Sequence, residues 1–306
     1  MKTCIIFALT IAVANCAFAE QVLYCAGTVR YPSGAPAPGV RVAFYPGQPN
    51  SGAGDYTEVR TDANGHYAII QPKKTSSFYW GPISSTNSIM ARDAERNLAA
   101  FCAFNRATSN IDLTLQPAVT LSGSVKNTEG LPVGGALVEI RFNSGESLPL
   151  LFEQPIPANE QGQFSIPALP QEVPYVVWGV RAKGYGSGSA HFAADNPPTN
   201  RYDFPVVVLK HADRKLAGQV LDINGKPLAG AEVKFYSDNG PDQPEDLVAK
   251  SDSEGNFVFD EVCEGRVMIS ALWTDPATKL FSQIGEVRSI QAGDTNIVIR
   301  LHAFNK

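Results

Sequence analysis

The stretch that decides the fold runs from Leu216 to Val233 and reads LAGQVLDINGKPLAGAEV, and SDSEGNF follows it at Ser251–Phe257. The residues around Gly218 open a strand. The segment NGKP, which ends at Pro227, turns the chain, because glycine adopts positive φ and proline presets φ. The alternating residues after this turn predict a second strand. The pattern Asp-x-x-Gly then predicts a tight turn into a returning strand.

The same pattern occurs two more times, earlier in the chain. The matching segments are CAGTV at Cys25–Val29 with DANGHY at Asp62–Tyr67, and LSGSV at Leu121–Val125 with EQGQF at Glu160–Phe164. The strand-opening glycines Gly27, Gly123 and Gly218 are 96 and 95 residues apart. This period is too long for a solenoid repeat and fits a whole small domain. With 26 Gly and 22 Pro in 306 residues, many short strands between turns predict an all-β chain of β-sandwiches.

At these residues the sequence resembles the carboxypeptidase regulatory-like domain family, over most of the chain and in three copies. The family has a transthyretin-like (prealbumin-like), seven-stranded Greek-key fold. The resemblance therefore implies three tandem Greek-key β-sandwich domains, at residues 20–117, 118–211 and 212–306. It implies no peptidase activity, because the family is named after a domain that sits beside a peptidase. Since the linkers between the repeats are about five residues long, we expect an elongated rod.

The N-terminal residues predict a signal peptide at 1–19. Met1 and Lys2 give a positive start, Ile5–Ala14 is apolar, and Ala17-Phe18-Ala19 fits the cleavage pattern. We therefore expect an exported protein that begins at Glu20 and is periplasmic, cell-surface or extracellular. No other stretch approaches the ~20 apolar residues of a transmembrane segment. A competing interpretation is a lipoprotein anchored through Cys16, although the Asn15 before it is a poor match.

Three cysteines, Cys25, Cys102 and Cys263, remain after removal of the leader. Export permits a disulfide between Cys25 and Cys102. The alternative is a pair of buried thiols, since free Cys is a common small core residue. Cys263 could be a buried thiol or an intermolecular link, and the first is favoured.

One segment of the first repeat has an ambiguous secondary structure. Residues 88–101 could form a helix from their propensities. The matching segment at 269–284 contains Pro276, which makes a turn explicit. We therefore expect a strand, a turn and a second strand at 88–101.

No group of residues in the sequence predicts catalysis or a cofactor. The net charge of −5 argues against a nucleic-acid partner, which would need a clustered basic face. The four histidines are scattered, without the spacing of a metal site. Asp62 and Asp252 could begin fragments of Ca²⁺ loops, but a full loop needs further ligands, so Asx-type turns are favoured. We expect a protein that is not an enzyme.

Aromatic residues are the remaining candidates for a binding site. Trp80, Trp178, Trp273 and Tyr185 could stack against a sugar, or they could pack in the sandwich cores. The favoured function is a structural or protein-interaction scaffold of the cell envelope or surface. The alternative is a carbohydrate- or peptidoglycan-binding accessory protein. The expected partner is accordingly an envelope protein or a polysaccharide, without a cofactor.

Overall fold

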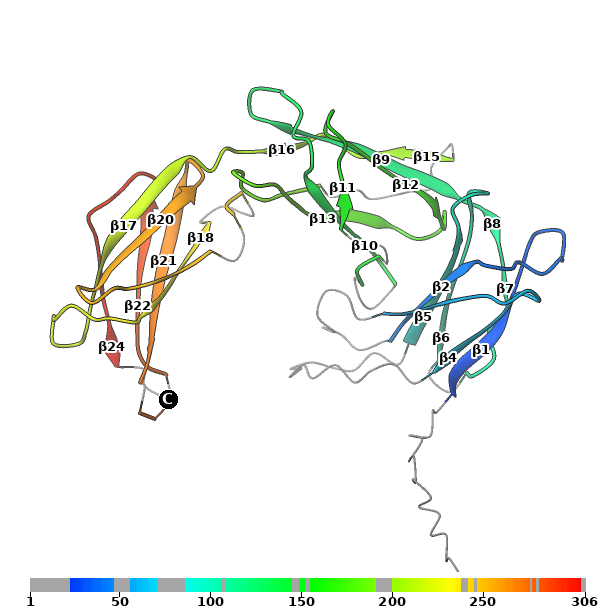
Figure 1. Ribbon diagram of the computed structural model, residues 1–306, viewed down its shortest axis with the longest axis horizontal. Helices are drawn as coiled ribbons and strands as arrows, with labels where there is room; N and C mark the ends of the chain where they lie inside the picture. The colour runs from blue at the N-terminus through cyan, green and yellow to red at the C-terminus, as the bar shows by residue number, and fades with distance from the viewer. Residues whose placement is uncertain are drawn as a thin grey trace, which may run out of the picture.

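The computed structural model describes residues 23–46, 56–70, 86–105, 108–144, 149–151, 155–190, 200–237, 242–244, 247–275, 277–278 and 281–303. The regular elements of these residues are the strands β1 to β24, so the all-β prediction is confirmed. The strands form three successive pairs of sheets, which we call unit one (β1–β8), unit two (β9–β16) and unit three (β17–β24) (Figure 1). The exact domain boundaries at residues 20, 118 and 212 stay predictions.

Unit one pairs a three-stranded sheet with a five-stranded sheet. The first has the order β4 (His66–Ile70), β1 (Leu23–Arg30), β7 (Leu113–Thr114). The second has the order β3 (Thr57–Arg60), β2 (Arg41–Tyr45), β5 (Thr86–Asp93), β6 (Leu98–Asn105), β8 (Gln116–Pro117). Strands β5 and β6 confirm the expected strand, turn and strand over residues 88–101.

Unit two repeats this order. One sheet has β12 (Gln163–Leu169), β9 (Val119–Asn127) and β15 (Arg201–Asp203), with β16 (Val207–Leu209) further along β9. The other has β11 (Ile156–Pro157), β10 (Leu137–Phe142), β13 (Tyr175–Arg181) and β14 (Gly188–Ala190).

Unit three has the same arrangement. One sheet has the order β20 (Asn256–Val262), β17 (Arg214–Leu221), β23 (Ile297–Arg300). The other has the order β19 (Val248–Lys250), β18 (Glu232–Ser237), β21 (Arg266–Thr274), β22 (Phe281–Gln291), β24 (His302–Ala303). In every unit the first strand is antiparallel to the fourth and parallel to the seventh, and the chain crosses repeatedly between the two sheets. This is the expected Greek-key sandwich.

The repeated polar turns are Asx turns, as the sequence favoured. In the first, the Asp62 carboxylate accepts the backbone N–H groups of Asn64 at 2.8 Å and His66 at 2.9 Å. The same two contacts recur at Asn127, Asn159, Asp222 and Asp252. The described residues contain no group of three His, Cys, Asp or Glu side chains that could hold a metal ion. These segments therefore shape turns.

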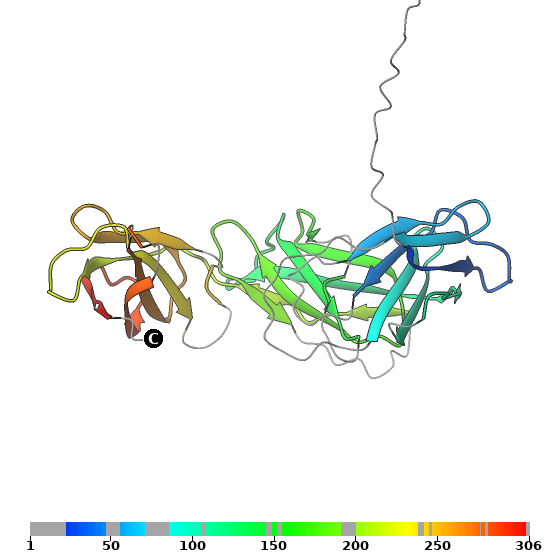
Figure 2. The same ribbon diagram turned by 90° about the horizontal axis from the view of Figure 1, so that it is seen from below.

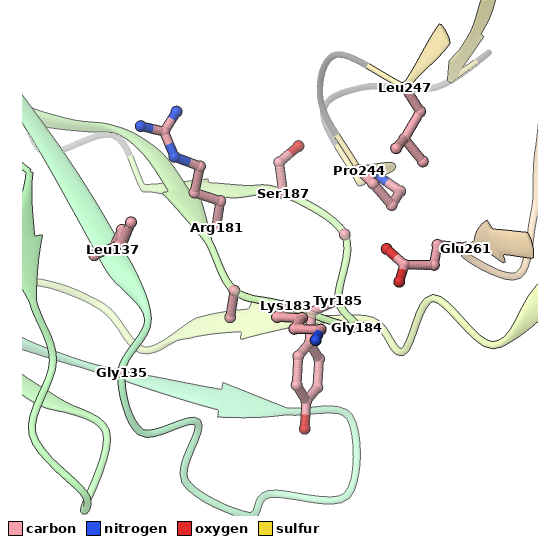
Figure 3. Close-up of a pocket in the computed structure, with 12 residues that line it drawn as sticks. Gly135, Leu137, Arg181, Lys183, Gly184, Tyr185, Ser187, Pro244, Leu247 and Glu261 are labelled. Atoms are coloured by element: carbon pink, nitrogen blue, oxygen red, sulfur yellow. The ribbon is translucent and has the colours of Figure 1, made fainter. Parts of the chain in front are cut away.

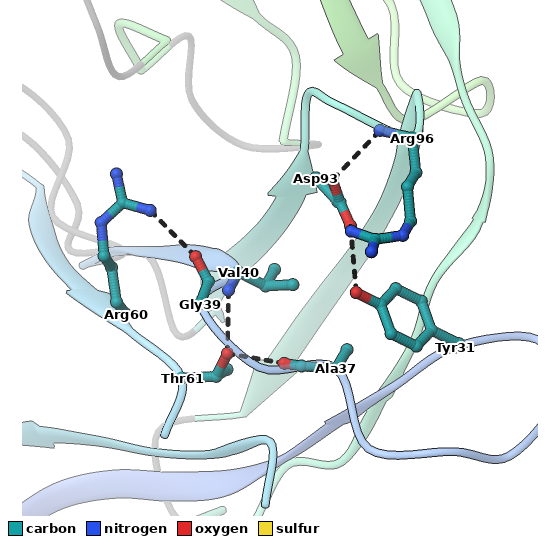
Figure 4. A network of polar contacts seen from close by, with 8 residues as sticks. All are labelled: Tyr31, Ala37, Gly39, Val40, Arg60, Thr61, Asp93 and Arg96. Carbon is teal, nitrogen blue, oxygen red and sulfur yellow. Dashed lines mark hydrogen bonds and ion pairs between the residues drawn. The ribbon is translucent and has the colours of Figure 1, made fainter. Parts of the chain in front are cut away.

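Hydroxyl and carboxylate groups tie the loops of unit one to its strands (Figure 4). The Thr61 hydroxyl donates to the Ala37 carbonyl at 2.6 Å and accepts the Val40 N–H at 2.9 Å. Ser251 makes the equivalent two contacts in unit three. In the second network of Figure 4, Asp93 accepts from both Tyr31 and Arg96. Each loop is thereby fixed by side chains that its own repeat supplies.

The apolar side chains form a separate core in each unit. Cys25, Val42 and Ile89 belong to the core of unit one, and Leu216 and Ile269 belong to that of unit three. The core of unit two is the largest, and it also includes side chains from unit one. Figure 2 shows the three units in a row, with unit three at one end.

Candidate functional site

Unit one presents the outer face of its five-stranded sheet to unit two. Ala43, Tyr45 and Met90 point away from the core of unit one and are buried in the core of unit two. The Tyr45 ring meets the Phe142 ring edge-on, with 4.8 Å between the ring centroids. The centroid of the Phe101 ring lies 5.8 Å from that of the same Phe142 ring. Strands β2 and β5 of this sheet are therefore buried on both faces, which joins the two units through an apolar interface.

A buried arginine completes this joint. Arg92 is only 3% exposed, and its guanidinium donates to the backbone carbonyls of Ala168 at 3.0 Å and Pro167 at 2.7 Å. Burial lowers the pKa of Arg92 to about 10, which still leaves the side chain charged at neutral pH. Beside it, the Asn97 amide accepts the Ala168 N–H at 2.8 Å and donates to the Ala118 carbonyl at 3.0 Å. The joint is thus specific as well as apolar.

This joint corrects the expectation of an elongated rod. The short linker at residues 116–118 allows unit two to fold back onto the sheet of unit one, and the three units follow an arch (Figure 1). Strand β2 carries a signal for this packing in the sequence. Its residues Val42-Ala43-Phe44-Tyr45 are a continuous apolar run that is buried at each position, where a strand buried on one face would alternate.

The joint between units two and three is polar. The Ser187 hydroxyl donates to the Gln243 carbonyl at 2.9 Å, and the Gln243 amide makes two hydrogen bonds to the backbone of Cys263. Gly186 permits this approach, since a Cβ there would lie 2.2 Å from the Asp242 carbonyl oxygen and 2.7 Å from the Cys263 sulfur. Lys210 and Asp242 form an ion pair across the joint. We call this set of contacts the clasp.

A groove of about 680 Å³ lies beside the clasp (Figure 3). Its lining includes Leu137, Arg181, Lys183 and Ser187 from unit two, and Pro244, Leu247 and Glu261 from unit three. Apolar side chains and charges of both signs therefore face the same space. Volume and lining are typical of a binding site for a small ligand or for part of a polymer.

Strands β10 and β13 contribute Leu137 and Arg181 to the lining of the groove, and further polar and aromatic side chains of the same two strands lie beside them. Trp178 is 46% exposed and sits at an irregular position of the pairing, where the register shifts between Glu139 and Ile140. The Arg141 guanidinium lies 4.8 Å from the centre of the Trp178 ring. Glu139 binds Arg181 at 2.8 Å. We call Trp178, Arg141, Glu139 and Arg181 the platform.

The aromatic candidates from the sequence have different surroundings. Trp80 lies outside the described residues. Trp273 is partly buried and packs against the core of unit three. Tyr185 is among the residues that line the groove, and its ring packs against the core of unit two, 4.7 Å from the ring of His211 (Figure 3). Trp178 is therefore the exposed member among those described, and Trp178 and Trp273 lie in different units.

The cysteine side chains of the described residues are free thiols, so the possible bridge between Cys25 and Cys102 is not formed in this structure. Both side chains pack at the core of unit one, one from each sheet, but only Cys25 is fully buried, so the alternative of two buried thiols holds for Cys25 and not for the half-buried Cys102. Cys263 is buried at the clasp, as favoured. Burial raises the pKa of Cys25 and of Cys263 to about 11.

The sequence did not single out the platform arginines or the groove. Arg141 and Arg181 stand in alternating strands, where charged residues normally face solvent. Only the pairing of β10 with β13 places them beside Trp178.

The part of the chain that the structure describes contains no helix long and apolar enough to cross a membrane.

No family model and no curated protein matches the chain. Among solved structures, the chain is similar to the TIE protein of Bacillus anthracis, with 14% identity, a TM-score of 0.28 and coverage of 92% of this chain and 51% of that one. It thus spans about half the length of that protein. A streptococcal ancillary pilin matches with 10% identity, a TM-score of 0.34 and coverage of 91% and 99%. The major pilin subunit BcpA of Bacillus cereus matches with 11% identity, a TM-score of 0.25 and coverage of 93% and 100%. At these scores, the fold assignment rests on the strand order described above.

Proposed function

We propose that the chain is a non-enzymatic exported protein that acts as a structural or protein-interaction scaffold of the cell envelope or surface. The observation that carries this proposal is the joint between units one and two. Side chains of both units share one core there, and Arg92 bonds the backbone of the neighbouring unit. A scaffold needs its modules held in fixed relative positions, and buried contacts between modules supply that.

Further support comes from the sequence. The predicted signal peptide at 1–19 directs the chain out of the cytoplasm, to the periplasm, the cell surface or the medium. The three repeats at 20–117, 118–211 and 212–306 resemble carboxypeptidase regulatory-like domains, which occur as accessory modules. The expected partner is an envelope protein.

The test is a retention experiment on the mature chain, Glu20–Lys306, immobilised and exposed to its own envelope fraction. One portion of the fraction is treated with protease and another has its polysaccharide degraded. The scaffold proposal predicts saturable retention of a defined protein that survives loss of polysaccharide and is reproduced with that protein in purified form. Retention that survives protease and disappears with the polysaccharide would contradict it.

A second candidate is a carbohydrate- or peptidoglycan-binding accessory protein. The exposed Trp178 ring beside Arg141 favours it, because an aromatic ring with an adjacent polar group can pack against a sugar ring. This candidate predicts retention of polysaccharide that the substitution Trp178→Ala abolishes while the protein stays folded.

A further inference from the structure

We propose that the platform and the adjoining wall of the groove bind an anionic polysaccharide, with Trp178 stacking on a sugar ring and the arginines binding its carboxylates. This inference rests on the second candidate function, carbohydrate binding, and names the ligand class and the residues. It is independent of the scaffold role of the joints.

The charge of this surface differs in sign from that of the chain. The platform and the next turn hold three cations, Arg141, Arg181 and Lys183, against one carboxylate, Glu139, which gives 3 − 1 = +2. The whole chain has a net charge of −5. A local positive excess on an acidic protein attracts an anionic ligand to this face. Glu261 on the opposite wall of the groove keeps the ligand's carboxylates on the side of unit two.

Neighbouring groups hold the platform arginines in fixed positions. Glu139 fixes the Arg181 guanidinium through an ion pair. Arg141 is half-buried with its guanidinium over the indole, and burial lowers the pKa of this arginine. Planar guanidinium groups match carboxylates with two parallel hydrogen bonds and stack on aromatic rings. The platform therefore offers an apolar ring and carboxylate-binding groups side by side.

The spacing suits a polymer of sugar rings. Trp178 and Arg181 are three residues apart on β13, or about 10 Å along a strand. Further along the chain, Lys183 lines the groove. A polysaccharide stacked on Trp178 can thus reach the second arginine and the groove within a few rings.

The same surface is poorly suited to an extended acidic peptide. Strand β13 is paired on both sides, with β10 and β14, so its main chain has no free edge for strand addition. The platform is a sheet face, and an added peptide strand would need such an edge. A flat sugar ring needs only the indole and the guanidinium groups.

The test is a calorimetric titration of the mature full chain with polygalacturonate and, separately, with the same polymer as its methyl ester. The ester keeps the sugar rings and removes the negative charge. We expect polygalacturonate to bind, the ester to bind at least about tenfold more weakly, and 0.5 M salt to weaken the binding of the acid form. Poly-glutamate serves as the peptide arm, and we expect no binding of it.

Two variants locate the site. Trp178→Ala and Arg181→Gln should each weaken binding of polygalacturonate about tenfold. Tyr236→Ala and Arg288→Gln are the matched controls, because Tyr236 is also 46% exposed and both lie in unit three. The controls should bind like the wild type, and circular dichroism should show all four variants folded.

Each alternative result overturns the inference in a distinguishable way. Equal binding of the acid and the ester would support carbohydrate binding but contradict a preference for an anionic ligand. If the control variants weakened binding as much as the platform variants did, the platform would not be the binding site. Binding of poly-glutamate alone would assign the surface to acidic peptides. Binding of none of the three polymers would overturn both the inference and carbohydrate binding, while the scaffold proposal would still be decided by the retention experiment.

Discussion

The guanidinium of Arg92 joins two units by donating hydrogen bonds to backbone carbonyls. Its two acceptors, Ala168 and Pro167, end strand β12 of unit two. We expect Arg92→Leu to lower the free energy of unfolding by about 1–3 kcal/mol for each acceptor left without a donor. The control Arg288→Leu replaces a side chain that is 71% exposed and should change stability by less than about 0.5 kcal/mol. Urea unfolding measures both, and equal effects would show that the joint does not depend on Arg92.

The carboxylates of the Asx turns link stability to pH. The backbone N–H of Asn256, followed by that of Glu254, holds the pKa of Asp252 below its usual value. The resulting stabilisation is present above the unfolded pKa, about 3.9, and is lost as pH falls through the lower folded pKa. Asp252→Asn keeps the acceptor oxygen, as Asn127 and Asn159 do in unit two.

We therefore expect the stability of Asp252→Asn relative to wild type to rise between pH 6 and pH 3. Urea midpoints at the two pH values measure this, with Glu254→Gln as a control that leaves the turn acceptor in place. A relative stability that stays constant with pH would show that the Asp252 carboxylate does not contribute through its charge.

The thiols of the mature chain should differ in reactivity. Burial raises the pKa of all three thiols, to about 11 for Cys25 and Cys263, which disfavours the reactive thiolate. Cys102 differs in being only half-buried, whereas Cys25 and Cys263 are fully buried. We expect a thiol reagent to label Cys102 first in the native protein and three thiols after denaturation. A single reactive thiol after denaturation would show that Cys25 and Cys102 become bridged after export.

At the scale of elements, the repeated glycines, which the structure places inside the first strand of each unit and not at its start, differ in what surrounds them. A Cβ at Gly27 would lie 1.8 Å from the backbone oxygen of Ile111, whereas one at Gly123 would meet the Phe164 ring at 2.4 Å. The backbone of Ile111 cannot move aside to accommodate the new Cβ, whereas the Phe164 side chain can repack. We expect Gly27→Ala to destabilise the protein by about 1–3 kcal/mol and Gly123→Ala by less, as measured by thermal unfolding. The reverse order would contradict this explanation of the repeated glycine.

The strands themselves were predictable because their determinants are local. Gly-x-Val, the Asx turns and the alternating runs around Asp62 and Asp252 specify strands and turns within a few residues. The repeat then gave the fold, because each copy carries the same landmarks. Trp178 shows the limit of this approach. Its exposure depends on a shift in the pairing of β10 with β13, which no local pattern records.

At the scale of the molecule, the relative placement of the units was not predictable from linker length. The short linker suggested a rod, but β2, β5 and β6 carry apolar side chains such as Tyr45, Met90 and Phe101 on their outer face, and these pack against unit two. The same limit applies to the groove, because Arg181 and Glu261 come together only when units two and three are joined by the clasp. Local sequence patterns predict the strands and turns of each unit. The interface between units one and two and the groove between units two and three form only when the units pack together.

The central claim is that buried contacts fix the units in one arrangement, and small-angle X-ray scattering of the mature chain tests it most directly. The account predicts a curve that matches the single arch formed by the described residues. It also predicts that the combined substitutions Tyr45→Ser and Arg92→Leu broaden the distribution of interatomic distances while the strand content stays the same. A wild-type curve that requires an ensemble of freely rotating units, and that the two substitutions leave unchanged, would contradict the claim.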